Sequence, residues 1–495
     1  MNKNERYIII ASIIITILFN ELFIFGGIGI SVPIYLFIYY FMIFMYCKKA
    51  EIRIDLKKNK LFIPIILCSL CFILFDNSLL MYLNVLFLWF MIIMNTSDIL
   101  QINQEEEYSL RTLINIYEIS VIYPFKNISK CICIIKSGVE EKCKNKLIIF
   151  SKVGVGLILG LMLLVIVIPL LISSDAAFSG MIRLIIENLN FNFIFKIFKR
   201  VIVCFMIFFP IYSFAYGITH KNSDINITKV SDKKIKFDFT IVITLISVIV
   251  AIYLLFCISQ FSYFISAFQG ILPKDYSYSQ YARKGFFECI PLSLINFMFI
   301  ILLNKLCYQN ESGYKKVLIR AYSFFICSIS LFLVITAISK LVLYMRVYGL
   351  TILRIYSAWF LIVLSLILIA VYLNSFYNKI NLFKNIFVIF TTMFLVLNYI
   401  NPDYIVAKYN TMLDKKDKFD TIQTFENLSL SAAEPLCNLD INYYNNKNND
   451  VVNYYNSMKN KYRKKISNKR EWYQWNLAKY KAEKMFEERD GVRAW

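Results

Sequence analysis

The chain has 495 residues, of which 58% are apolar, and its mean hydropathy of +0.58 excludes an ordinary soluble protein. Its formal net charge is +21. Much of this charge lies in loops between apolar segments, and basic loops beside an anionic leaflet need no other partner. The composition therefore predicts a protein whose partner is the lipid bilayer, and we expect no nucleic-acid partner.

Eleven apolar segments follow one another through the first 400 residues. A helix needs about 20 apolar residues to cross the hydrocarbon core of a bilayer, and helices satisfy their own backbone hydrogen bonds there. The segments cover residues 7–25, 29–46, 61–75, 78–94, 147–172, 201–216, 239–265, 286–306, 317–343, 351–373 and 380–400. The sequence thus predicts an all-α integral membrane protein with about eleven transmembrane helices over 1–400 and a short, partly helical soluble tail over 401–495.

Basic residues in the connections predict the orientation in the membrane, because cytoplasmic loops carry an excess of Lys and Arg. Alternate connections are basic, whereas the turns at 26–28 and 76–77 contain no Lys or Arg. We therefore expect a cytoplasmic N-terminus, and an odd number of spans puts the C-terminal tail outside. Basic residues before the sixth and eighth spans oppose this pattern: Lys196, Lys199, Arg200, Lys274, Arg283 and Lys284.

Motifs for metal binding or catalysis are missing from the sequence. Cys68 and Cys71 form a C-x-x-C pair inside an apolar segment, where cysteine behaves as a small apolar residue. The cysteines of the 131–143 loop have no histidine near them, and the single histidine, His220, has no acid or nucleophile at a recognisable spacing. No nucleotide-binding or hydrolase motif is present. We expect no metal, no cofactor and no recognisable catalytic residue.

Ionisable residues at the predicted outer ends of the spans are the candidates for a site. Asp175 follows the fifth span, Arg283 and Glu288 lead into the eighth, and Arg346 and Arg354 flank the turn between the ninth and tenth. A charge at the centre of a bilayer costs about 2.5–3.5 kcal/mol, and only long side chains escape this cost by reaching the interface. We expect Glu288 to pair with Arg346 or Arg354 and all five residues to converge on a ligand. Salt bridging between helices is the alternative.

Hydropathy falls sharply at residue 401, and the tail that follows is short for a core of its own. Residues 471–489 predict an amphipathic helix, because Trp475, Ala478, Ala482 and Met485 recur at helical spacing. We expect this face to pack on the protein itself rather than on a partner.

Several short blocks resemble one bacterial family. Residues 281–288, Tyr-Ala-Arg-Lys-Gly-Phe-Phe-Glu, closely resemble the Tyr-Ala-Arg-x-Gly-Phe-Phe-Glu block of a multi-spanning family known as domain of unknown function 4173, related to 4153. Further blocks are similar in order: 173–178, 348–354, Asn401-Pro402-Asp403, Asn410, Asp420, Ala433-Glu434-Pro435-Leu436 and Trp475-Asn476. The resemblance covers roughly residues 60–480. It implies a polytopic protein of the bacterial inner membrane and no established activity, ligand or cofactor.

Three functional hypotheses fit these observations. The first is a permease-like or regulatory membrane component that binds a small or lipid-linked ligand at the outer polar cluster, with the tail lying over that site. The second is a membrane-embedded enzyme that uses Glu288 or Asp175 on an envelope substrate. The third is a scaffold for partner membrane proteins. A cavity holding the polar residues would favour the first two, and a solid bundle would favour the third.

Overall fold

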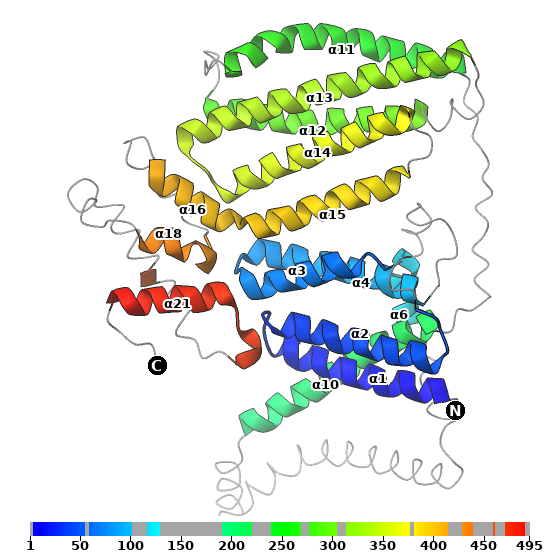
Figure 1. Cartoon of the computed structure of the whole chain (residues 1–495), viewed down its shortest axis with the longest axis vertical. Coiled ribbons are helices and arrows are strands. Elements are labelled where there is room, and N and C mark those ends of the chain that lie inside the picture. The colour runs from blue at the N-terminus through cyan, green and yellow to red at the C-terminus, as the bar shows by residue number, and fades with distance from the viewer. Residues whose placement is uncertain are drawn as a thin grey trace, which may run out of the picture. The chain divides into compact units, whose positions relative to one another are not determined.

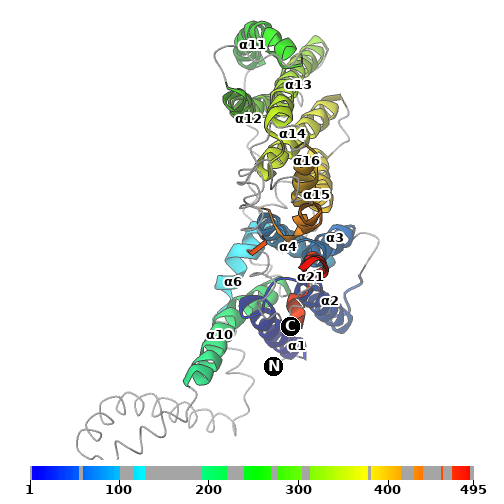
Figure 2. The ribbon, with the colours of Figure 1, turned by 90° about the vertical axis from the view of Figure 1, so that its left-hand side faces the viewer.

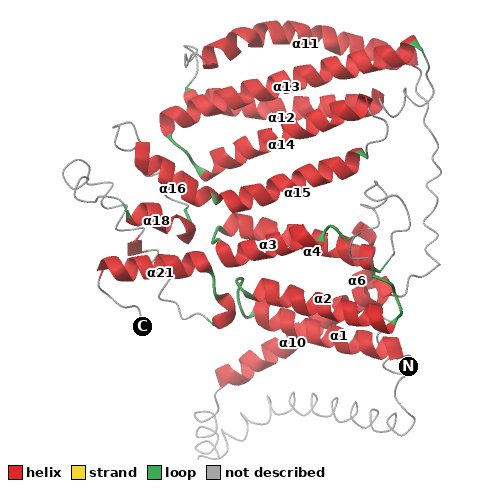
Figure 3. Ribbon diagram, in the orientation of Figure 1, coloured by secondary structure: helices red, strands yellow, loops and turns green. Residues whose placement is uncertain are grey.

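A computed structural model describes residues 3–54, 59–100, 116–128, 191–219, 239–268, 277–303, 313–376, 381–413, 428–438, 459–460 and 471–490. Within these ranges every regular element is a helix and there is no strand (Figure 3). The prediction of an all-α polytopic membrane protein is therefore confirmed.

Nine of the described helices are long and apolar enough to cross a membrane. They are α1 (Lys3–Phe19) with its π-helical extension η1 (Asn20–Ile24), α2 (Ser31–Lys49), α4 (Ser78–Ile99), α10 (Phe191–Thr219), α11 (Phe239–Phe268), α12 (Tyr278–Leu302), α13 (Tyr314–Tyr348), α14 (Ile352–Phe376) and α15 (Leu382–Ile400). A tenth, α3 (Phe62–Leu74), is apolar but has only 13 residues. The predicted span at 147–172 lies outside the described residues. Each of the other ten predicted spans corresponds to one of these helices.

The chain forms two compact units. The first comprises residues 1–59, 93–104 and 114–222, and the second comprises 60–92, 105–113 and 223–495. In the first unit, α1, α2 and α10 pack together with η2 (Glu118–Ile122) and α6 (Tyr123–Lys126). Asn95 Nδ2 donates to the hydroxyl of Tyr40 at 3.0 Å, and Arg200 pairs with Glu21 at 3.0 Å. Arg200, an exception to the expected charge pattern, thus has an acidic partner near the end of α1.

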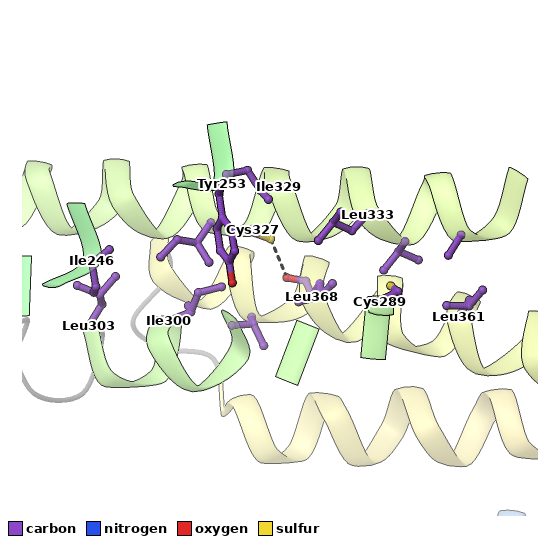
Figure 4. Close-up of a cluster of buried hydrophobic side chains, with 14 of the residues drawn as sticks. Ile246, Tyr253, Cys289, Ile300, Leu303, Cys327, Ile329, Leu333, Leu361 and Leu368 are labelled. Carbon is purple, nitrogen blue, oxygen red and sulfur yellow. Dashed lines mark hydrogen bonds between the residues drawn. The ribbon is translucent and has the colours of Figure 1, made fainter. Parts of the chain in front are cut away.

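In the second unit α13 packs against α11, α12 and α14, and it runs beside α12 and α14 in both views (Figures 1 and 2). Its buried face alternates small and apolar residues, including Ser330, Ala337 and Leu341. Small residues let helices approach closely in a bilayer, where van der Waals packing replaces the hydrophobic effect between helices. Figure 4 shows the resulting core, in which Cys327 Sγ donates to the carbonyl of Leu368 at 3.3 Å.

Helix α12 begins at Tyr278, eight residues before the predicted start of the eighth span. The cause is a capping box: Ser277 Oγ accepts from the Gln280 amide at 3.3 Å, and Gln280 Oε1 accepts from the Ser277 amide at 3.2 Å. These contacts satisfy amides that the first helical turn leaves without partners. Arg283 therefore lies inside the helix instead of in the connection before it, and Glu288 lies in the helix, as the predicted span placed it.

The described parts of the tail pack against the rest of the second unit. They are α16 (Pro402–Leu413), the 3₁₀ turn η5 (Leu430–Ala432), α18 (Ala433–Cys437), the 3₁₀ turn η6 (Trp472–Gln474) and α21 (Leu477–Asp490) (Figure 1). Val406, Leu436 and Ala482 are buried in a small core that also contacts Leu350 and Ile355. This core places tail residues on the turn between α13 and α14. The domain boundary at residue 400 remains a prediction.

The predicted amphipathic face of the last helix is largely buried. Ala478 and Ala482 are buried in α21, and Met485 packs on the same small core. Trp475, just before the helix, remains 41% exposed. The prediction that this face packs on the protein itself agrees with these contacts.

Asn410 provides the first test of how the tail is held. It is fully buried, its Nδ2 donates to the carbonyl of Leu350 at 2.7 Å, and its Oδ1 accepts from the Leu350 amide at 2.8 Å. We predict that Asn410→Ala lowers the free energy of unfolding by about 1–3 kcal/mol, because both backbone groups lose their partner. Denaturant titration in mixed micelles measures the change. Met412→Ala, an exposed change on the same helix, is the control, and equal stability of the two variants would contradict the prediction.

Candidate functional site

A fully buried carboxylate lies where the last span meets the tail. Helix α15 ends at Asn401, which adopts a left-handed conformation with φ of 53°, and Pro402 then starts α16. Proline suits the first helical position because its φ is already fixed near the helical value. This turn places Asp403 in the first turn of α16, where its Oδ2 accepts from Asn77 Nδ2 at 2.8 Å and from Ser429 Oγ at 2.7 Å.

The partner surface of Asp403 is the turn between α3 and α4. Asn77 caps α4, since its Oδ1 accepts from the Leu80 amide at 2.9 Å, and capping residues of this kind satisfy free amides at a helix start. The Tyr356 hydroxyl also donates to Asn77 Oδ1 at 3.4 Å. The amide of Asp76 donates to Ser431 Oγ at 2.9 Å. Two segments of the tail thus bind one two-residue turn.

Helix α21 adds a third attachment to the same turn. Asn476 Nδ2 donates to the carbonyls of Phe72 and Phe75 at 2.8 and 2.7 Å, which are left free where α3 ends. Its Oδ1 accepts from the Lys479 amide at 3.2 Å and so caps α21. Lys479 Nζ also pairs with Asp76 Oδ1 at 3.2 Å. We call these contacts, together with those of Asp403 and Ser431, the tail-docking network.

Asp403 is the titratable centre of this network. Burial raises the pKa of its carboxyl above the usual value, although the hydrogen bonds from Ser429 and Asn77 act in the opposite direction, and the nearby Asp76 raises it further. Its other oxygen, Oδ1, is buried and accepts no hydrogen bond from the described residues. A buried oxygen without a partner favours the protonated, neutral form of the acid.

A pocket of about 280 Å³ opens between the tail and the ends of the spans. Its walls come from the end of α3, the start of α16, η5, α18 and α21, and most of them are apolar. Glu434 on α18 and Lys481 on α21 also line it, and both side chains are exposed. The pocket therefore combines an apolar interior with one acidic and one basic group.

Four of the predicted site residues lie elsewhere in the second unit, on α12, α13 and the start of α14: Arg283, Glu288, Arg346 and Arg354. Lys340 on α13 is only 6% exposed, and its Nζ lies 4.8 Å from the ring centroid of Tyr281. The lysine stem crosses Gly285, where an added Cβ would lie 2.8 Å from Lys340 Cδ. Glu288 and Lys284 both interact electrostatically with Lys340. The cation that interacts with Glu288 is thus Lys340 on α13, six residues before Arg346.

Arg354 has a different role from the expected pairing with Glu288. Its Nη1 donates to the carbonyls of Tyr348, at 3.1 Å, and Gly349, at 2.5 Å, and its guanidinium lies 3.9 Å from the ring centroid of Tyr344. These contacts close the end of α13, where positive groups complement free carbonyls. Arg354 therefore stabilises the turn between α13 and α14.

Of the remaining predicted residues, two lie in the described part of the chain. Arg283 and Arg346 are exposed. Each is two positions from a residue on the contact between α12 and α13, and two positions rotate a side chain by about 200° around a helix. Asp175 lies outside the described residues. A ligand-binding role for Asp175, Arg283, Glu288, Arg346 and Arg354 remains a prediction.

The sequence held signals for the tail-docking network. Asp76-Asn77-Ser78 precedes an apolar run, a typical helix start, and Asn401-Pro402-Asp403 combines a helix stop with a proline that starts another helix. No sequence pattern predicts that these two segments, more than 300 residues apart, pair with each other. Hydrogen bonding between distant polar residues follows no sequence period, so only the fold brings them together.

The chain belongs to the family described as Domain of unknown function (DUF4153), which matches residues 62–439, more than half of the chain. Membership of family 4173, which the sequence blocks resemble, is not shown. The matched region begins with α3 and extends just past α18, so it contains Asp76, Asn77, Asp403, Ser429 and Ser431 but not α21. No curated protein and no solved structure matches the chain.

The raised pKa of Asp403 predicts how tail docking depends on pH. The neutral acid is favoured in the folded state, so its stabilising effect is complete below the unfolded pKa, near 3.8, and is lost as pH rises through the folded pKa. Asp403→Asn keeps the acceptor oxygen and carries no charge. We predict that the unfolding free energy of Asp403→Asn exceeds that of the native chain by an amount that grows as pH rises. This difference increases above a pH of about 3.8 and then levels off.

Denaturant titrations of both proteins in mixed micelles between pH 4 and 9 measure this difference. Asp76 and Tyr356 also face Asp403, and Lys479 pairs with Asp76, but these groups are the same in both proteins. What these groups contribute to stability in both proteins therefore largely cancels in the difference. A difference that does not change with pH would show that Asp403 has the same pKa in the folded and unfolded states.

Proposed function

We propose that this is a multi-pass protein of the bacterial cytoplasmic membrane that binds a small or lipid-linked ligand on its extracytoplasmic side. It acts there as a regulatory or permease-like component. The observation that carries the proposal is the pocket of about 280 Å³ between the tail and the span ends. A concave, mostly apolar pocket with a few polar groups is the usual form of a small-molecule site.

The tail-docking network supports this function because it builds the pocket from distant parts of the chain. Phe75 at the end of α3, Tyr404 on α16 and Leu477 on α21 all line it. These walls come together only when the tail is docked, so binding and docking are thermodynamically linked. A ligand that holds the tail in place would give partner membrane proteins a docked tail conformation to recognise.

Two exposed arginines, Arg283 on α12 and Arg346 on α13, belong to the same proposal. Helix α16 bonds to the turn between α13 and α14 through Asn410 and to the turn between α3 and α4 through Asp403. Both turns therefore lie at one end of the second unit, the end that the basic loops assign to the outside. Arg283 and Arg346 are exposed there and would meet an anionic part of a lipid-linked ligand.

Orientation can be tested with cysteine labelling. Cys437, the native cysteine in the described tail, is buried and is a poor reporter. We predict that Tyr480→Cys, at a half-exposed site on α21, reacts with a membrane-impermeant maleimide in intact, wall-permeable cells. Lys48→Cys, at an exposed site near the end of α2, should react only after lysis. The parent protein sets the background, and the opposite pattern would place the tail in the cytoplasm.

Ligand binding can be tested by filling the pocket. Leu477 is half-buried and lines it, so a larger side chain there occupies ligand space without entering a closed core. We predict that Leu477→Trp accumulates in the membrane at the native level but fails to restore the phenotype lost on deletion of the gene.

The matched control is Tyr480→Trp, which lies on the same helix, is 52% exposed and does not line the pocket. It should restore the phenotype fully. Full restoration of the phenotype by Leu477→Trp would show that the function does not need the pocket. Loss of the variant protein from the membrane would show that Leu477 is structural.

A further inference from the structure

The chemistry of the pocket walls narrows the class of ligand, an inference that rests on the proposed function. Glu434 and Lys481 line the pocket from α18 and α21, two helices that pack against each other. Both side chains are exposed, and neither forms an ion pair with another described residue. A carboxylate and an ammonium group are therefore available together at one pocket.

The remaining lining is largely apolar. Leu74 and Phe75 come from α3, Leu430 from η5, and Leu477 and Met485 from α21. Pockets for drug-sized ligands have volumes of about 300–1,000 Å³, so a volume of about 280 Å³ suits a smaller molecule with a compact apolar part.

We infer that the ligand is a small zwitterion with an apolar side chain, of the class of the hydrophobic α-amino acids. Its ammonium group would pair with Glu434, its carboxylate with Lys481, and its side chain would contact the apolar wall. An anionic phosphate would be repelled by Glu434, and an uncharged acyl chain would leave both ionic groups unused. Charge-assisted hydrogen bonds are about twice as strong as neutral ones, so two of them orient a small ligand.

The test uses the full chain in lipid nanodiscs and three probes of nearly one shape. L-Leucine carries both charges, leucinamide lacks the carboxylate, and 4-methylpentanoate lacks the ammonium group. Isothermal titration calorimetry measures binding of each. We expect saturable binding of leucine and at least about tenfold weaker binding of either analogue, which corresponds to the loss of one charged pair.

Two variants assign the contacts. Lys481→Gln should remove the preference for leucine over leucinamide while keeping the preference over 4-methylpentanoate, and Glu434→Gln should do the reverse. Both residues are exposed, so neither change disturbs a buried contact. The control variant Leu477→Trp should bind none of the probes.

Equal binding of leucine and 4-methylpentanoate would overturn the inference that the ligand is a zwitterion and would indicate an acyl-chain ligand. If no probe binds but Leu477→Trp still abolishes the phenotype in cells, the ligand class is wrong and the proposed function stands. If no probe binds and Leu477→Trp is fully functional, both proposals fail.

Discussion

Asp403 is buried at the junction of the last span and the tail, and its Oδ2 accepts hydrogen bonds from both the α3–α4 turn and the tail. Burial of an isolated carboxylate is costly, and the cost falls when the group is hydrogen-bonded or protonated. Asn77 and Ser429 provide the bonds only when α16, the turn and η5 are together. One buried polar group therefore requires three distant segments to meet.

This requirement makes the tail an integral part of the second unit instead of a separate soluble extension. By composition, residues 401–495 are a soluble extension too short for a strong core. In the structure the described part gains its core by sharing Leu350 and Ile355 with the α13–α14 region, and Asn476 supplies donors to carbonyls left free at the end of α3. The tail thus completes the second unit and closes one side of a pocket whose other walls are span ends.

The spans were predictable because bilayer crossing requires long apolar runs, and the signal depends on composition alone. The ends of the spans were harder to predict. Helix α12 starts at Tyr278 because of the Ser277 and Gln280 capping box, which a hydropathy pattern does not detect. Helix α16 was missed for the same reason, since its start is defined by Pro402 and its packing by Val406 and Ala407.

The candidate site was harder to predict than the fold. The prediction gathered charged residues by their position at span ends, but position along a helix does not fix the face. Arg354 instead caps α13, and Lys340, which fits over Gly285, is the cation that interacts with Glu288. The polar residues that hold the tail are mostly uncharged, and their partners depend on contacts between segments far apart in sequence.

The central claim is that the tail is docked on the α3–α4 turn in the folded protein. Hydrogen exchange at the amide of Asp76, which donates to Ser431 in the tail, tests it most directly when combined with reversal of the Asp76–Lys479 pair. Asp76→Lys and Lys479→Asp should each accelerate exchange in the turn and in α21, because like charges then oppose docking. The double variant should restore slow exchange. Fast exchange at this amide in the native chain, or no restoration in the double variant, would contradict the account.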